Sequence, residues 1–254
     1  MKNKIINISL FPYFGNKDNE MEEIYANLPD MNSVSVIIEP FCGSFALTRY
    51  LLLHYPYKSY ICNDNDEMLI KTYKALQYDD TLSELLEFFK TFEVRDKKHY
   101  DEFKKENSIR SFLFTHIIYS MRPGLYNRNK NKFNEKDLNK LIHFNKNYKY
   151  ILFKHGDAQD IIENYKYYNN VFMFLDPPFL LTSNLYNKGA MSEFYFIFLK
   201  DVNNIKAQIL GVCGDHLLTL TFYEYYNIKI KFKTKINYLG NKSKSHENIY
   251  ISNY

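Results

Sequence analysis

The stretch Val171-Phe-Met-Phe-Leu175, followed by Asp176-Pro177-Pro178-Phe179, decides how this sequence folds. Five consecutive apolar residues that run into a proline pair predict a strand buried on both faces, as in a parallel sheet. Each proline restricts the backbone and removes an N–H donor, so the strand ends at Asp176. We therefore expect Asp176 at the carboxyl end of a parallel strand, where α/β proteins bind their ligands.

The chemistry of this loop follows from its residue types. A carboxylate beside the carbonyl groups of a proline pair can accept hydrogen bonds from both hydrogens of an amino group. These two hydrogen bonds orient the lone pair of the nitrogen toward an electrophile. The loop would therefore catalyse by positioning and electrostatics. Phe179 offers a ring for stacking on a nucleobase, a contact of about 1–3 kcal/mol per base. A second interpretation, a proline-capped strand end with a structural Asp176, stays open.

The same patterns recur along the chain. Apolar runs predict strands, and apolar residues at helical spacing predict helices between them. We expect an α/β fold: a Rossmann-like sheet with helices on both faces, interrupted by a mostly helical insertion. The predicted division is residues 1–85 plus 150–254 for the sheet domain and residues 86–149 for the insertion. Strands are predicted at 33–39, 60–62, 150–153, 171–175, 207–212, 228–234 and 248–252, and helices at 45–54, 67–76 and 110–121.

Two further motifs follow predicted strands. Glu39-Pro-Phe41-Cys-Gly43-Ser44 places a glycine at the turn after the first strand, where a ligand can approach the backbone. It lacks the GxGxxG spacing of a dinucleotide site, and a plain strand–turn–helix connection explains it equally well. Asp64 follows the second strand about twenty residues later, where an acidic residue binds ribose hydroxyls. Its alternative role is to cap the helix that follows.

Charge is distributed unevenly. The chain carries a net charge of +4, but residues 94–149 hold 14 Lys and Arg against 6 Asp and Glu. A basic segment inside an otherwise slightly acidic protein is typical of nucleic-acid binding. A solvated lysine-rich surface is the other interpretation.

The remaining composition excludes several classes. Three cysteines, Cys42, Cys62 and Cys213, form no zinc-type spacing, so we expect reduced thiols, no metal site and an intracellular protein. The first residues contain no signal-peptide pattern, and no apolar stretch is long enough to span a bilayer.

These motifs, taken in order, resemble the Dam family of DNA adenine methyltransferases over nearly the whole chain. Phe11-Pro-Tyr13-Phe-Gly-Asn-Lys17 is similar to the N-terminal cofactor motif of that family, which implies that Tyr13 and Lys17 lie at the cofactor. The resemblance likewise implies cofactor contacts for Glu39, Phe41, Gly43, Ser44, Asp64, Gly156, Asp157 and Asp176. The cofactor would be S-adenosylmethionine.

The resemblance also implies a reaction and a substrate. Asp176, Pro177, Pro178 and Phe179 would form the catalytic loop, acting on the N6 amine of an adenine flipped out of duplex DNA. The insertion would recognise the target and contact DNA through Arg122, Leu125, Arg128, Lys130 and Lys132. The Val-Pro-Phe-Gly-like continuation of the family's DNA-reading hairpin is replaced by Glu135-Lys136-Asp137, which leaves the recognition sequence open. The role would be in DNA methylation, as in restriction-modification, by a monomer or weak dimer.

Two alternatives stay open. Enzymes that methylate the N4 amine of cytosine, or adenine in RNA, share this chemistry. A catalytically silent methyltransferase-like DNA-binding subunit would keep the fold without activity. The intact Lys17, Gly43, Asp64 and Asp176 argue against the silent subunit.

Overall fold

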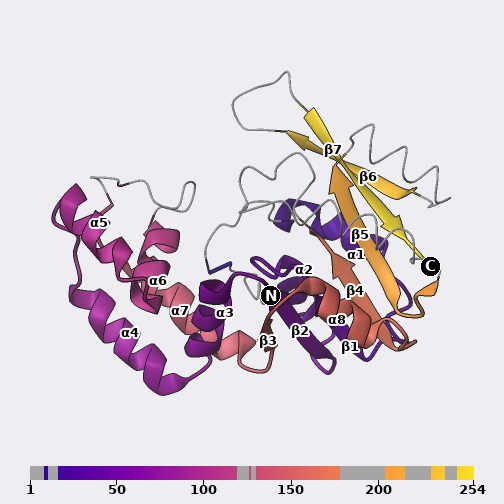
Figure 1. Ribbon diagram of the computed structural model, residues 1–254, viewed down its shortest axis with the longest axis horizontal. Helices are drawn as coiled ribbons and strands as arrows, with labels where there is room; N and C mark the ends of the chain where they lie inside the picture. Colours follow the sequence, from indigo (N-terminus) through magenta and orange to yellow (C-terminus); the bar gives the residue numbers. More distant parts are fainter. Residues whose placement is uncertain are drawn as a thin grey trace, which may run out of the picture. The chain divides into compact units, whose positions relative to one another are not determined.

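The computed structural model describes residues 9–10, 17–118, 126, 130–177, 204–214, 230–237 and 245–254. The chain divides into two compact units (Figure 1). The first is drawn from Met1–Asp18, Gly43–Pro56 and Asp64–Gly156, and the second from Asn19–Cys42, Tyr57–Asn63 and Asp157–Tyr254.

Parallel strands form the centre of the second unit. Its strands lie side by side in the order β2-β1-β4-β5-β7-β6. β1 pairs in parallel with β2 and β4, and β4 with β5, whereas β7 is antiparallel to both β5 and β6. The predicted α/β fold with a parallel sheet is therefore confirmed, and the order reverses between β1 and β4. The strands are β1 (Val36–Glu39), β2 (Ser59–Asp64), β4 (Val171–Leu175), β5 (Gln208–Gly214), β6 (Ile230–Asn237) and β7 (Ser245–Ser252).

Both faces of these strands are covered. One face carries Met173, Leu175 and Ile209, which pack with Ile161 and Ile162 of α8 (Ala158–Tyr165). The opposite face buries Phe172, Phe174, Leu210 and Tyr250. Helix α1 (Met21–Ala26) follows the short 3-10 helix η1 (Asp18–Glu20), and the side chain of Glu20 contacts β6 and β7 on this second face.

The first unit is mostly helical. Two of its helices lie in strongly charged segments, in which apolar residues recur at helical spacing between the charged ones. One lies at residues 97–105, and the other begins with a capping box between Asn134 and Asp137. The elements are α2 (Ala46–Leu51), α3 (Glu67–Leu76), α4 (Asp79–Thr91), α5 (Lys97–Lys105), α6 (Ile109–Ile118), α7 (Glu135–Tyr148) and β3 (Leu152–His155).

Phenylalanines hold these helices together. The rings of Phe89 and Phe133 stack with centroids 4.1 Å apart, and those of Phe92 and Phe103 lie 4.3 Å apart. Phe114 of α6 packs against members of both pairs. Such aromatic pairs contribute about 0.5–1.5 kcal/mol each beyond their area. Within the described segments, no helix is both long and apolar enough to cross a membrane.

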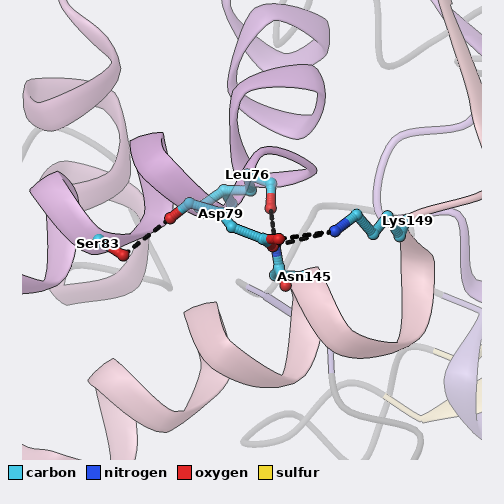
Figure 2. Close-up of polar contacts among 5 residues, drawn as sticks. All are labelled: Leu76, Asp79, Ser83, Asn145 and Lys149. Atoms are coloured by element: carbon cyan, nitrogen blue, oxygen red, sulfur yellow. Dashed lines mark hydrogen bonds and ion pairs between the residues drawn. The ribbon is translucent and has the colours of Figure 1, made fainter.

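A polar joint connects the start of α4 to the end of α7 (Figure 2). The Asp79 carboxylate accepts from Lys149 Nζ at 3.0 and 3.1 Å and from Asn145 Nδ2 at 3.1 Å. Asn145 Nδ2 also donates to the backbone carbonyl of Leu76 at 3.0 Å. The hydrogen bond and charge of Lys149, with the amide of Asn145, lower the pKa of Asp79.

This joint makes stability depend on pH. Since the folded-state pKa of Asp79 lies below its unfolded value, its contribution is present above the unfolded pKa and is lost as pH falls through the folded one. We expect Asp79→Asn to lower the urea midpoint at pH 7 and to have a smaller effect at pH about 3, where the carboxylate begins to be protonated. Asp80→Asn, on the next residue of the same helical turn, is the control. If Asp79→Asn lowered the urea midpoint equally at both pH values, the prediction would be contradicted.

Candidate active site

The turn that follows β1 contains two left-handed residues. Gly43 has φ 45° and Phe45 has φ 43°, a region that costs about 1–2 kcal/mol for a residue with a side chain. The Phe45 ring packs edge-on against Tyr73 and Tyr148 at 5.0 and 5.2 Å. The Tyr73 hydroxyl donates to the Gly43 carbonyl at 2.8 Å. Aromatic packing in the first unit thus offsets the strain and fixes the predicted glycine turn.

Asp64 holds the same turn from the end of β2. Its Oδ2 accepts from the Gly43 amide at 2.9 Å and its Oδ1 from the Asp66 amide at 3.0 Å. The Gly156 amide donates to the Asp64 backbone carbonyl at 3.2 Å. Burial raises the pKa of Asp64, while these backbone hydrogen bonds partly counter the rise. Three predicted cofactor residues, Gly43, Asp64 and Gly156, therefore lie together in the first unit.

The alternative role of Asp64 as a helix cap is wrong. Asp66 caps α3 instead, accepting from the Leu69 amide at 3.0 Å. A carboxylate has about four lone-pair sites, and Asp64 uses one on each oxygen for backbone amides. The remaining sites suit the paired hydroxyls of a ribose. The donor set of this turn therefore fits a nucleoside cofactor.

Asn63 is a site residue that the sequence did not indicate. Its Nδ2 donates to the Pro40 carbonyl at 3.0 Å, and its own carbonyl accepts from the Cys42 amide at 2.8 Å. The side chain is buried. In the second unit, Asn63 thus shapes the segment that leaves β1. An Asn directly before the candidate Asp64 was the available signal.

Arg49 is a second residue that the sequence analysis missed. It is 1% exposed, its Nε donates to the Ser44 carbonyl at 3.0 Å, and its guanidinium lies 2.8 Å from Asp18 Oδ1. The guanidinium also lies over the Phe45 ring, 5.7 Å from its centroid. Asp18 adjoins Lys17, a predicted cofactor residue that is buried. Arg49 therefore joins the end of the N-terminal motif to the glycine turn. A lone arginine in an apolar helix was its signal.

The carboxyl ends of β1 and β4 meet at the point where the strand order reverses. Val36, Ile37 and Ile38 pair with Val171, Phe172 and Met173. Continuing this register places Glu39 beside Phe174, with Asp176 two residues further along β4. Such a switch point is where open α/β sheets bind ligands.

The residues at this edge differ in burial. Glu39 is 3% exposed, Asp176 is half-buried and Pro177 is buried. The side chain of Phe41 packs against the apolar cluster under α8. Glu39 and Asp176 are thus the acidic groups at the edge.

The other predicted residues stand as follows. Asp157 is exposed and accepts from the Gln159 amide at 2.8 Å at the start of α8. Lys130 is half-buried, whereas Lys132 is exposed and forms a β-bridge with Glu93. Several predicted residues lie outside the described ones: Tyr13, Arg122, Leu125, Arg128, Pro178 and Phe179.

A glycine turn, an acidic residue after β2 and an Asp-Pro sequence after β4 define a Rossmann-like methyltransferase domain. The chain belongs to the D12 class of N6 adenine-specific DNA methyltransferases, whose family profile matches residues 13–209. The predicted family is confirmed.

Individual relatives are more distant. The type II methyltransferase M.MjaIII of Methanocaldococcus jannaschii is 29% identical over 199 residues, which are 65% of this chain and 66% of the relative. The chain thus spans just under two thirds of that protein. Among solved structures, TrmN from Thermus thermophilus has 10% identity and a TM-score of 0.39, covering 92% of this chain and 47% of TrmN. The N-terminal domain of human METTL16 in complex with SAH has 10% identity and a TM-score of 0.40, covering 92% of this chain and 66% of that one.

The Arg49–Asp18 pair is open to a direct test. Asp18→Asn leaves the buried guanidinium without its anion, a loss of about 3–5 kcal/mol for a fully buried pair. Because the Asp18 side chain is 34% exposed, we expect a loss of about 1–2 kcal/mol in the free energy of unfolding. Urea denaturation measures it, with Asp101→Asn on exposed α5 as the control. Adding Arg49→Leu to Asp18→Asn should recover part of the lost free energy of unfolding. If the losses of the two single variants simply added in the double variant, the pairing of Arg49 with Asp18 would be contradicted.

Proposed function

We propose that this protein transfers a methyl group from S-adenosylmethionine to the N6 amine of an adenine flipped out of duplex DNA. The observation that carries the proposal is the position of Asp176. In a chain of the D12 class, its carboxylate directly follows β4 at the switch point beside β1. The proposed site of action is inside the cell, where the DNA is, as a monomer or weak dimer.

Asp176 would hold the acceptor amine. Its carboxylate and the Pro177 carbonyl accept the two amine hydrogens, so the nitrogen lone pair points at the methyl group. S-adenosylmethionine supplies an electrophilic methyl carbon on a sulfonium sulfur when it is bound. Phe179 stacks on the extruded base, and no covalent enzyme intermediate is required.

The glycine turn would hold the cofactor. Gly43 presents backbone without a side chain, and Asp64 keeps lone pairs for ribose hydroxyls. The proposed cofactor set is completed by Tyr13, Lys17, Glu39, Phe41, Ser44, Gly156, Asp157 and Asp176. The support is that Asp64 and Gly43 are hydrogen-bonded and rigidly placed.

The basic insertion, residues 86–149, would bind DNA, and residues 1–85 plus 150–254 would carry the chemistry. The basic residues of α5 are exposed along the helix, as are Arg95, Arg110, Lys132 and Lys136. Exposed Lys and Arg neutralise phosphates and make binding depend strongly on salt. Arg122, Leu125 and Arg128 are the proposed base-reading residues; an arginine fork on guanine is the commonest specific contact.

Removing the carboxylate at Asp176 tests the chemistry. We expect Asp176→Ala to reduce methyl transfer by at least about 100-fold, because the amine loses its acceptor. Circular dichroism should change little. Tritiated methyl transfer to duplex DNA measures the rate, with Asp160→Asn at an exposed position of α8 as the control.

Nucleoside analysis of the product separates the alternatives. Methyl in N6-methyladenine supports the proposal, whereas N4-methylcytosine, or transfer to RNA alone, replaces it with the corresponding alternative. DNA binding without any transfer by the wild type identifies a silent subunit. A wild-type rate for Asp176→Ala rules out the assigned catalytic loop.

The insertion is tested through salt dependence. Each lost phosphate contact reduces the slope of log affinity against log salt by about 0.9. We expect Lys130→Gln with Lys132→Gln to weaken duplex binding and to lower this slope by up to about 2. Lys206→Gln, an exposed lysine outside the insertion, is the control. An unchanged slope in a fluorescence anisotropy titration would remove both lysines from the interface.

A further inference from the structure

A hydrogen-bond network around a half-buried carboxylate lies on the second face of the sheet. Glu20, the residue before α1, accepts from Tyr250 Oη at 2.7 Å and from Asn248 Nδ2 at 3.1 Å. The Thr234 hydroxyl donates to the same carboxylate. Thr234, Asn248 and Tyr250 are all buried. Within the described residues, these three partners of Glu20 are neutral donors.

The strand register places this network on the same face as Asp176. Leu175 pairs with Gly211, so Asp176 lies beside Val212, and Val212 pairs with Tyr250. Paired residues project to the same side of a sheet. Asp176 and Tyr250 therefore share a face and are separated by two strand spacings, about 10 Å.

Electrostatics agrees with this geometry. Burial, then the charge and hydrogen bond of Glu20, and then the charge of Asp176 raise the pKa of Tyr250. The phenol thus stays protonated and acts as a donor to Glu20. Phe232 stacks on the Tyr250 ring with centroids 4.2 Å apart, which fixes the ring on this face.

We propose that Glu20 is an electrostatic determinant of cofactor binding, whose fixed negative charge favours the cationic sulfonium over the neutral thioether. The inference rests on the proposed function. In-line transfer to an amine held by Asp176 requires the sulfonium within a few ångströms of that residue. Glu20 contacts Tyr250, which itself lies about 10 Å from Asp176. The charge of Glu20 then acts over a distance on that order through partly buried protein, where water screens it less than in bulk solution.

The chemical consequence concerns product exchange. Methyl transfer converts a cationic sulfonium into the neutral thioether S-adenosylhomocysteine and leaves the adenine methylated, with the amine proton released. A fixed negative charge stabilises the substrate form of the cofactor and not the product form. Glu20 would therefore promote replacement of the spent cofactor by a fresh one.

If Glu20 were only a structural contact between η1 and strands β6 and β7, its removal would have a different effect on cofactor affinity. Losing a merely structural contact weakens both cofactor forms equally, whereas losing a charge weakens only the cationic form. Glu20→Gln separates these roles, because the amide keeps the shape of the side chain and removes its charge. Glu22→Gln is the matched control: it removes the same charge two residues away, from the exposed first turn of α1.

Isothermal titration calorimetry of the full chain with S-adenosylmethionine and with S-adenosylhomocysteine tests the proposal. We expect Glu20→Gln to weaken S-adenosylmethionine about three- to tenfold, from the interaction of unit charges at this distance. The affinity of Glu20→Gln for S-adenosylhomocysteine should change less than about twofold. Glu22→Gln should change the affinity for either ligand by less than about twofold as well. Tyr250→Phe loses one hydrogen bond but keeps the charge, so the ratio of the two affinities should stay at the wild-type value.

The other outcomes overturn the proposal. If Glu20→Gln weakens the affinities for both ligands equally, Glu20 has a structural role only. If neither affinity changes, the charge is too distant to act on the cofactor. Glu20→Leu is a second neutral variant that carries the same test if Glu20→Gln does not fold by circular dichroism. A wild type that binds neither ligand overturns the proposed function itself, whereas normal wild-type binding with an unchanged affinity ratio in Glu20→Gln overturns this inference alone.

Discussion

The hydrogen bond between the Asp64 carboxylate and the Gly43 amide is the interaction on which the candidate cofactor site depends. The turn after β1 needs left-handed backbone at both Gly43 and Phe45, which sterics oppose for the phenylalanine. Asp64 and the Tyr73 hydroxyl fix the glycine from two sides, and the aromatic cluster around Phe45 offsets its strain. Local strain of this kind persists only where surrounding structure over-determines the backbone.

The proposed chemistry depends on a second constraint, the order of the parallel strands. β1 and β4 are parallel neighbours, so their carboxyl ends lie at the same edge of the sheet. The strand that follows β1 in the chain lies on one side of this pair, and the strand that follows β4 lies on the other side, which makes this edge a switch point. Asp176 emerges there directly from a strand buried on both faces. A carboxylate placed by such a strand has little freedom, which suits a mechanism based on positioning rather than on a covalent intermediate.

Charged side chains are placed by different means in the two units. In the first unit, Arg49 is buried against Asp18, the Ser44 carbonyl and the Phe45 ring, so a cation supports the turn. In the second unit, Glu20 is half-buried and accepts hydrogen bonds from neutral donors of β6 and β7. Each of these two charges is satisfied by hydrogen bonds, as the cost of desolvation requires. The lysines of α5, by contrast, are exposed to water.

Much of the architecture could be predicted from the chain alone. The strand Val171–Leu175 and the helix Glu67–Leu76 have the predicted bounds, because an apolar run before prolines and a capped amphipathic segment are local signals. Helix α7 was not predicted as a separate element, because charged and polar residues separate its apolar ones and its capping box of Asn134 and Asp137 lies in a polar segment. The order of motifs also identified the family before any fold was known.

The sequence by itself therefore determined the strands, the glycine turn, the acidic residue after β2 and the Asp-Pro-Pro-Phe loop, because each is encoded within a few neighbouring residues. Only the tertiary structure decided that Asp64 holds Gly43, that Arg49 holds Asp18, and that Glu20 shares a face with Asp176. These pairs are separated by 21 to more than 150 residues, and strand register brings the last one together. Periodicity within a segment carries no information about which distant segment pairs with it, so packing alone sets these contacts.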